Sequence, residues 1–370
     1  MRKEKIAPVT MEVIQLKGSK FHPMLQAITA ALLFGASAPI AKLLLGNIEP
    51  VPLAAFLYLG SGIGLLIFKV FQGFRKEYKK AEAGIKNEDI KWLFGSVLVG
   101  GIFAPIILMF SLKNTPASTT SLLQNFEGVS TTLIAVFIFK EAIGKRVWLA
   151  VAAITSASIL LSWNPDSEWG FSIGALGVLL ACVFWGLDNN FTRNISAKDP
   201  LITVIIKGIG AGSFSLLLAV LLHNEFPDLK IIIGSMLLGF FCYGLSIVLF
   251  ILSMRNLGAS RASAFLGTAP FAGALLSFLL LHELPNILFC AAIPIMIIGA
   301  VLLLGEEHIH RHIHDLIEHE HRHNHNDGHH EHEHEHENIK LPEHSHLHKH
   351  EVIEHTHAHT PEIHHRHAHK

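Results

Sequence analysis

One acidic residue near the middle of a long apolar stretch is the first candidate for chemistry. Glu127 lies within Ala117–Phe139, and Gln124 and Asn125 precede it in the sequence QNFEGV. A carboxylate at the centre of a bilayer costs about 3 kcal/mol or more, so it faces protein or water rather than lipid. A carboxylate removed from water holds a proton more readily, which suits a proton relay or pairing with a cationic group of a solute. The alternative is a structural hydrogen bond between helices.

Other polar residues within apolar stretches are candidates for the same site. Asp188 and Asn189 lie near the end of a later apolar run, where Asp188 either contributes to a site or reaches the membrane surface. Lys42 and Arg193 occupy equivalent positions near opposite membrane faces. Each of these cations is suited either to a carboxylate of a solute or to a lipid headgroup. With Glu127, Gln124 and Asn125 they form the predicted solute- and proton-binding set.

Four residues are predicted to have a gating or structural role. Glu141 and Glu283 each end an apolar run, at opposite membrane faces, and each follows a basic or imidazole side chain. A cap or gate contact at a helix end is the expected role for both. Pro39 lies inside its apolar run and predicts a kink or break there. Pro270 lies near the start of another run and is assigned to the same structural group.

The C-terminal segment has the most unusual composition in the chain, because 24 of the 27 histidines lie in 308–370. A segment this polar is expected to be disordered without a ligand. Imidazole is a common ligand for Zn, Ni, Co and Cu, so the tail is predicted to bind such ions. A pH-responsive tail and a drifting low-complexity sequence are the alternatives. The histidines taken as candidate ligands are His308, His310, His312, His314, His329, His330, His332, His334 and His336.

The elements that position these residues are predicted from apolar runs and from a repeat. A constant offset of 142 positions relates Leu112–Glu141 to Met254–Glu283, which indicates two copies of one unit. A helix needs about 20 apolar residues to cross a bilayer. The ten runs that approach this length are 23–45, 51–70, 92–112, 117–139, 147–163, 171–191, 201–222, 231–253, 260–281 and 286–304.

Lysine and arginine are concentrated in alternate loops between these runs, which predicts a cytoplasmic N-terminus and, with ten spans, a cytoplasmic C-terminus. Five spans per copy is an odd number, so the second copy enters the membrane inverted, as in many secondary transporters. The predicted segments are an N-terminal segment (1–22), two five-helix repeats (23–163 and 171–304) and the His-rich tail (305–370). The chain is 50% hydrophobic and only 16% charged, as expected for a polytopic membrane protein.

Several motifs resemble the EamA-type permeases of the drug/metabolite transporter superfamily. They are FGASAPIAK at 34–42, LLQNFEGVSTTLIAVFIFKE ending in Glu141, and ASAFLGTAPFAGALLSFLLLHE ending in Glu283. The resemblance covers about 23–304. It implies an all-α polytopic membrane protein, with ten transmembrane helices in two inverted five-helix EamA repeats, working by alternating access. Members of this family often export solutes in exchange for protons, and their substrates vary widely. The His-rich tail departs from the family pattern.

The predicted function is therefore secondary active transport of a small organic solute, coupled to protons, in a plasma or inner membrane. The alternative is a divalent-metal exporter whose tail collects Ni, Co or Zn; a membrane-bound metal sensor or store is a third class. No nucleophile–base set or nucleotide-binding loop occurs, so neither an enzyme nor a nucleic-acid partner is expected. No cofactor is required, and a homodimer is compatible with the sequence.

Overall fold

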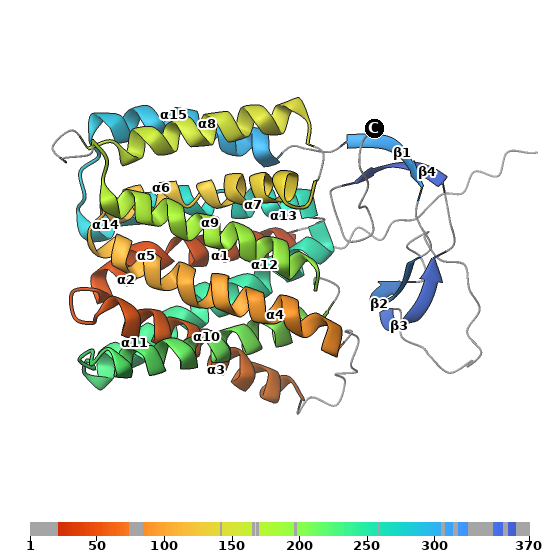
Figure 1. Ribbon diagram of the computed structural model, residues 1–370, viewed down its shortest axis with the longest axis horizontal. Helices are drawn as coiled ribbons and strands as arrows, with labels where there is room; N and C mark the ends of the chain where they lie inside the picture. Colours follow the sequence, from red (N-terminus) through yellow and green to blue (C-terminus); the bar gives the residue numbers. More distant parts are fainter. Residues whose placement is uncertain are drawn as a thin grey trace, which may run out of the picture.

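The structure is a computed structural model in which helices form one body and short strands follow it. The residues that it describes are 21–73, 84–140, 143–164, 167, 170–195, 198–257, 259–304, 308–313, 317–324, 343–350 and 354–359. The helices lie side by side along the long axis of the molecule, and the strands lie beyond one end of the helical body (Figure 1). That end is the one at which α4 begins.

The helices of the first repeat form five lengths that run alternately up and down. They are α1 (Phe21–Gly35) with α2 (Ser37–Leu44); α3 (Pro50–Gly73); η1 (Asn87–Asp89), α4 (Ile90–Ser96), the π-helix η2 (Val97–Phe103) and α5 (Ala104–Lys113); α6 (Ala117–Leu123) with α7 (Phe126–Phe137); and α8 (Lys145–Ser162). The breaks and the π-helix divide lengths that the sequence predicts as continuous runs.

The second repeat follows the same order. Its helices are α9 (Ile173–Arg193); α10 (Pro200–Leu221); α11 (Leu229–Leu238), the π-helix η3 (Gly239–Leu245) and α12 (Ser246–Leu257); α13 (Ala259–Leu266) with α14 (Ala269–Leu281); and α15 (Ile287–Leu304). Among the described residues, eight helical stretches are long and apolar enough to cross a membrane, and Ile287–Leu303 is a shorter apolar helix. The remaining predicted span is the one divided into α6 and α7.

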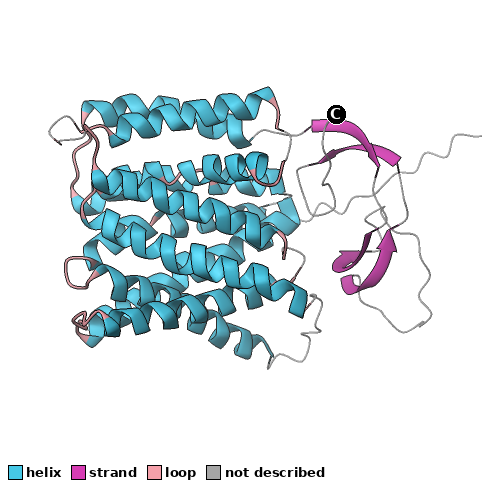
Figure 2. Ribbon diagram, viewed as in Figure 1, coloured by secondary structure: helices cyan, strands magenta, loops and turns pink. Residues whose placement is uncertain are grey.

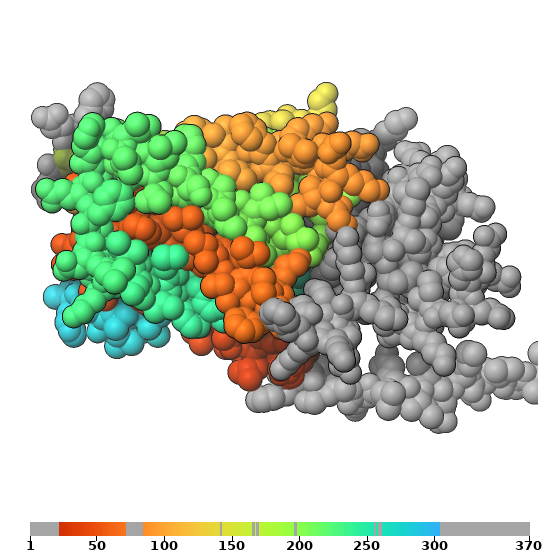
Figure 3. Space-filling model, turned by 90° about the horizontal axis from the view of Figure 1, so that it is seen from below, coloured from red at the N-terminus to blue at the C-terminus, as the bar shows by residue number. Residues whose placement is uncertain are grey.

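The two repeats interlock, because helices of one pack mainly against helices of the other. α3 lies along α10, α8 along α15, α7 and α5 along α9, and α1 along α12. From below, segments of the first repeat alternate with segments of the second across the surface (Figure 3). A site between the repeats is therefore surrounded by side chains from both.

The offset of 142 positions that relates the two motifs in the sequence also relates structural details. It carries η2 onto η3 and α8 onto α15, residue for residue. It also relates Lys140 to His282, and both have a left-handed backbone (φ 56° and 52°) directly before the glutamates Glu141 and Glu283. Such a backbone is rare for residues other than glycine. The sequence repeat is thus a repeat of local geometry.

Close packing of α3 on α10 depends on glycines that face one another. A Cβ atom added to Gly62 would lie 2.6 Å from Ile209 N, and one added to Gly208 would lie 2.6 Å from Gly62 N. Backbones approach this closely only where both residues are small, which is the usual basis of helix association in membranes. The alternate glycines in these two runs therefore serve packing.

Part of the tail, which the sequence predicts to be disordered without a ligand, is described by the structure. Four strands occur in it, β1 (His308–Ile313), β2 (Ile317–Asn324), β3 (Glu343–His350) and β4 (Glu354–His359), drawn in magenta in Figure 2. β1 pairs with β4 and β2 pairs with β3, both antiparallel. Within these strands the histidines recur at every second residue, which is the period of an extended strand.

Replacing Gly208 by alanine should destabilise the helical body, because the added methyl group meets the backbone of α3. Overpacking of this kind costs about 1–3 kcal/mol. Gly210→Ala is the matched control, since its Cβ atom would lie 3.5 Å from Val97 Cγ1, an ordinary contact. We expect a lower apparent melting temperature in detergent for Gly208→Ala than for Gly210→Ala. Equal melting temperatures would contradict the packing argument.

Candidate solute-binding site

Glu127 is held at the contact between α7 and α9. Its Oε1 accepts a hydrogen bond from Asn189 Nδ2 at 2.8 Å, and the same amide donates to Thr131 Oγ1 at 3.1 Å. Thr131 Oγ1 in turn donates to the carbonyl of Glu127 at 2.8 Å. The helices come this close because Gly186 has no side chain; a Cβ atom there would lie 2.7 Å from Ser130 Cβ. The contacts of Glu127 are thus with neutral groups.

Asn189 is exposed although it lies on the inner face of α9. The face of α9 that points away from the bundle carries Leu176, Leu180 and Val183, which are 46%, 47% and 42% exposed. At about 100° per residue, Asn189 lies on the opposite side of the helix from these three. An exposed residue on that side is reached from within the bundle, so water or a solute has access to the amide that holds Glu127.

A second acidic residue of the bundle, Asp188, is neutralised by a lysine. Asp188 Oδ2 pairs with Lys207 Nζ of α10, and the two side chains are 6% and 19% exposed. Asp188 Oδ1 accepts hydrogen bonds from Ser96 Oγ and from Thr192 Oγ1, the latter at 3.2 Å. A buried carboxylate is tolerated when a cation and hydrogen bonds satisfy it in this way. Asp188 therefore does not extend to the membrane surface.

The π-helix η2 presents a backbone carbonyl next to this ion pair. Gly100 O accepts hydrogen bonds from Tyr58 Oη at 2.8 Å and from Trp185 Nε1 at 3.1 Å. In the π-helical register its donor would be Pro105, which has no N–H. Tyr58 of α3 and Trp185 of α9 thus donate the hydrogen bonds to this carbonyl that the helix itself cannot supply. A Cβ atom at Gly100 would lie 2.1 Å from Asp188 Oδ2, so glycine is needed for Asp188 to fit.

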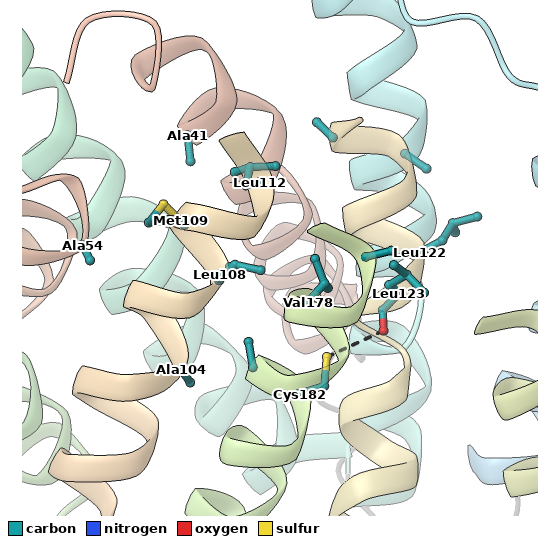
Figure 4. Close-up of a cluster of buried hydrophobic side chains, with 14 of the residues drawn as sticks. Ala41, Ala54, Ala104, Leu108, Met109, Leu112, Leu122, Leu123, Val178 and Cys182 are labelled. Atoms are coloured by element: carbon teal, nitrogen blue, oxygen red, sulfur yellow. Dashed lines mark hydrogen bonds between the residues drawn. The ribbon is translucent and has the colours of Figure 1, made fainter. Parts of the chain in front are cut away.

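The break between α6 and α7 places Gln124 and Asn125 beside Glu127. Gln124 is buried, and its carbonyl accepts a hydrogen bond from Glu127 N at 3.0 Å. Asn125 Nδ2 bonds locally to Leu122 O at 3.0 Å. Cys182 of α9 lies in the buried apolar cluster, and its thiol donates to Leu123 O (Figure 4). These contacts support the break, and neither amide side chain has a described bond to Glu127.

Lys42 and Glu283 both stabilise helix ends at the end of the bundle where α6 begins. Lys42 Nζ donates to the carbonyls of Leu112, Lys113 and Thr115, at and just beyond the C-terminus of α5. The C-terminus of a helix carries partial negative charge, so a cation is favourable there. In this structure Lys42 thus stabilises a helix end, and its contact with a solute carboxylate stays a prediction.

Glu283 caps the N-terminus of α6. Its Oε1 accepts from Ala117 N at 2.7 Å, and its Oε2 accepts from Ser118 N at 2.9 Å and from Ser118 Oγ at 2.6 Å. This is a cap contact between the two repeats. It joins the loop after α14 to the start of the span that carries Glu127.

The remaining predicted residues are placed as follows. Arg193 is half-buried at the end of α9, at the opposite end of the bundle from Lys42. Pro39 follows the break between α1 and α2, and Pro270 lies in the first turn of α14. Glu141 lies outside the described residues, as do His314, His329, His330, His332, His334 and His336, whereas His308, His310 and His312 lie in β1.

Sequence reasoning missed the partners that complete the polar layer. From the sequence alone, Lys207 is suited either to a carboxylate or to a lipid headgroup. The sequence does not mark the other partners, which are Ser96, Thr131, Tyr58 and Trp185. Lys207 is the one with an indication in the sequence, because an intramembrane cation calls for an acidic partner. Among the side chains that the structure describes, no group of three or more His, Cys, Asp and Glu is arranged to hold a metal ion.

Interlocked helical repeats with apolar spans and a polar layer between them define a polytopic helical membrane protein. The chain belongs to the EamA-like transporter family, whose model matches residues 23–163 and 172–305. It is therefore a membrane transporter of the drug/metabolite transporter superfamily, and the resemblance seen in the motifs is confirmed.

Two individual proteins and one solved structure are similar to this chain, and the first of the proteins is itself described as a transporter. An uncharacterized transporter of Methanothermobacter thermautotrophicus is 27% identical over 290 residues, which cover 75% of this chain and 84% of the relative. A phospho-N-acetylmuramoyl-pentapeptide-transferase of Salinispora arenicola is 28% identical over 186 residues, 46% of this chain and 48% of that protein. A crystal structure with a TM-score of 0.54 and 18% identity covers 76% of this chain and 94% of its own, and it supports the fold alone.

Removing one partner of the buried ion pair should cost more than removing both. Lys207→Met leaves Asp188 buried and unpaired, and breaking such a pair typically costs about 3–5 kcal/mol. We expect Lys207→Met to lower the apparent melting temperature in detergent. The double variant Lys207→Met/Asp188→Asn should recover most of that loss. If the double variant is as unstable as the sum of the single variants, the pair is not coupled as described.

Loss of the Glu283 cap should destabilise the protein at the start of α6. Removing an N-cap typically costs about 0.5–2 kcal/mol. The measurement is the apparent melting temperature of Glu283→Ala against that of Glu225→Ala, an exposed glutamate in the loop between α10 and α11. A decrease is expected for Glu283→Ala alone, and an equal decrease in both variants would speak against the cap.

Proposed function

We propose that the protein exchanges protons for a small organic solute across the membrane, with Glu127 as the residue that binds both. The observation that supports this most is the environment of the Glu127 carboxylate. It lies mid-span between the repeats, it is bonded to neutral groups, and the amide that holds it is accessible from within the bundle. The midplane between inverted repeats is where carriers of this architecture bind their solutes.

The contrast between the two acidic side chains supports the choice of Glu127. Asp188 is neutralised by Lys207 and bonded on both oxygens. Asn189 binds only Oε1 of Glu127, and we assign Oε2 to the proton or to a hydrogen-bond-donating or cationic group of the solute. A proton and such a group compete for one carboxylate, so binding of one favours release of the other. This competition couples the two fluxes, and amines and amino acids have suitable donor groups.

Alternating access requires that each end of the bundle close in turn around the site. At the end where α6 begins, Glu283 joins the second repeat to the start of α6, and Lys42 joins α2 to the C-terminus of α5 within the first repeat. We propose that these contacts close that end in the conformation described here, with access to Glu127 from the end at which α9 terminates. We assign the second end to the cytoplasm of a plasma or inner membrane, because the basic loops lie there.

Substitution of Glu127 by glutamine tests the proposal directly. The purified protein is reconstituted into liposomes that contain a pH-sensitive dye, and amino acids, amines and divalent metal ions are added in turn. We expect an organic amine or amino acid to drive proton flux in the intact protein. Flux should fall by at least about tenfold in Glu127→Gln, since an amide cannot exchange a proton near neutral pH.

The matched control is Glu88→Gln, which alters an exposed glutamate in η1. Its proton flux should equal that of the intact protein. Undiminished flux in Glu127→Gln would contradict the assigned role of Glu127. Flux with divalent metals and with none of the organic solutes would contradict the proposed class of solute. An apparent melting temperature of Glu127→Gln in detergent equal to that of the intact protein verifies that the bundle is intact.

A further inference from the structure

The charged side chains around Glu127 leave one charge without an opposite charge bonded to it. The carboxylate of Glu127 accepts a hydrogen bond from the neutral amide of Asn189, whereas the neighbouring Asp188 is paired with Lys207. Glu127 lies close enough to both members of this pair to interact with them electrostatically. We call Glu127, Asp188 and Lys207 the charged layer. Because the charges of Asp188 and Lys207 cancel, the layer carries a single negative charge when Glu127 is ionised.

Three further lysines at the ends of the bundle are also held by acceptors of the protein. Lys42 Nζ donates to three backbone carbonyls at and just beyond the C-terminus of α5. Lys69 pairs with Asp199 at 2.9 Å, and Lys198 pairs with Asp89 at 3.2 Å. A carboxylate on the solute would have to displace an acceptor of the protein from any of these cations, just as it would from the lysine of the charged layer.

The hydrogen-bond donors next to Glu127 are used in the same way. The amide of Asn189 has two N–H groups, and its Nδ2 bonds Glu127 Oε1 at 2.8 Å and Thr131 Oγ1 at 3.1 Å. The half-buried Trp185 donates its N–H to a carbonyl of η2. Gln124 supplies a neutral amide and no positive charge. A solute carboxylate at this depth would thus lack an opposite charge, which is costly for an ion removed from water.

Two oxygen acceptors remain for a solute in this region. Within the described part of the chain, neither Oε2 of Glu127 nor Oδ1 of Asn189 accepts a hydrogen bond, and Asn189 is exposed on the inner face of α9. An ammonium group with at least two N–H donors matches these acceptors, because it supplies a positive charge and hydrogen bonds together. A quaternary ammonium group supplies the charge without the hydrogen bonds. The chemistry of the site therefore favours primary and secondary amines.

We propose that the solute is a monovalent primary or secondary ammonium compound without a carboxylate, exchanged one for one with a proton. This inference rests on the proton-coupled transport proposed above for Glu127. The proton leaves Oε2 of Glu127 for water as the ammonium group binds, so either cation neutralises the charged layer. The two loaded states then have the same charge, and the exchange moves no net charge across the membrane. A zwitterion or a dication exchanged for one proton would move net charge.

The test compares matched sets of solutes in proteoliposomes of the full-length protein that contain a pH-sensitive dye. Each set holds a primary amine, the amino acid that adds a carboxylate to it, and its trimethylammonium derivative. Ethanolamine, serine and choline form one set, and tyramine, tyrosine and trimethyltyramine form another. We expect proton flux with an amine to exceed that with its two derivatives at least about tenfold. Protein-free liposomes correct for passive entry of the neutral amine. A potassium diffusion potential set with valinomycin should leave the exchange unchanged.

The matched control is the double variant Asp188→Asn/Lys207→Met, which removes two charges and leaves the layer with one negative charge. It should keep both the preference for the amine and the independence from potential, and its apparent melting temperature verifies that it is folded. Loss of either property in the folded double variant would overturn the charge balance.

Two other outcomes separate this inference from the proposal on which it rests. Flux that is lost in Glu127→Gln, but that is as fast with the amino acid or the trimethylammonium derivative, or that responds to potential, would overturn the inference alone. Absence of flux with every solute of the panel, or flux that persists in Glu127→Gln, would contradict the proposed transport itself and the inference with it.

Discussion

The structure depends on one constraint, that backbone polar groups within the membrane-spanning part need hydrogen-bond partners from the protein itself. Water is absent from the bilayer core, so every helix break must be satisfied by protein. The carbonyl of Gly100 is bonded by Tyr58 and Trp185, and that of Leu123 by Cys182. The free amides at the start of α6 are bonded by Glu283. Each of these partners lies outside the helix whose backbone it bonds, so the breaks that shape the site also join its elements.

Charge within the bundle follows the same logic. Asp188 and Lys207 neutralise each other against the backbone of η2, which makes them part of the scaffold. Glu127 is instead supported by amide and hydroxyl groups, which fix its position without fixing its charge. A carboxylate in such surroundings responds to what arrives from outside the protein. The coupling proposed for Glu127 requires such rigid support, because the residue would change its charge state.

The sequence predicts the architecture well because its determinants are local and periodic. Apolar length defines the spans, and the repeat around Glu141 and Glu283 defines the two halves. Pro105 is a signal in the sequence for the first π-helix. Nothing comparable marks the second π-helix, which could therefore not be predicted. The hydrogen-bond partners in the site could not be predicted from the sequence, because Asn189 and Glu127 are distant in it and their contact depends on the glycine at position 186. The polarity of the tail predicts disorder, while the two-residue period of its histidines is the period of a strand.

The break in the first span has a consequence for the direction of transport. A carrier built from two identical inverted halves would have inward- and outward-facing states related by symmetry, and therefore equal in free energy. Here α1 and α2 are separated at Ala36, while the equivalent α9 runs unbroken through 21 residues. The first spans of the two repeats align with an offset of 151 positions, which places 34–42 on 185–193. With this offset the Asp188–Lys207 pair likewise has no counterpart, because Ser37 and Phe56 stand at the equivalent positions. Symmetry therefore does not make the two end states equal in free energy, and a resting state that faces one side of the membrane is expected.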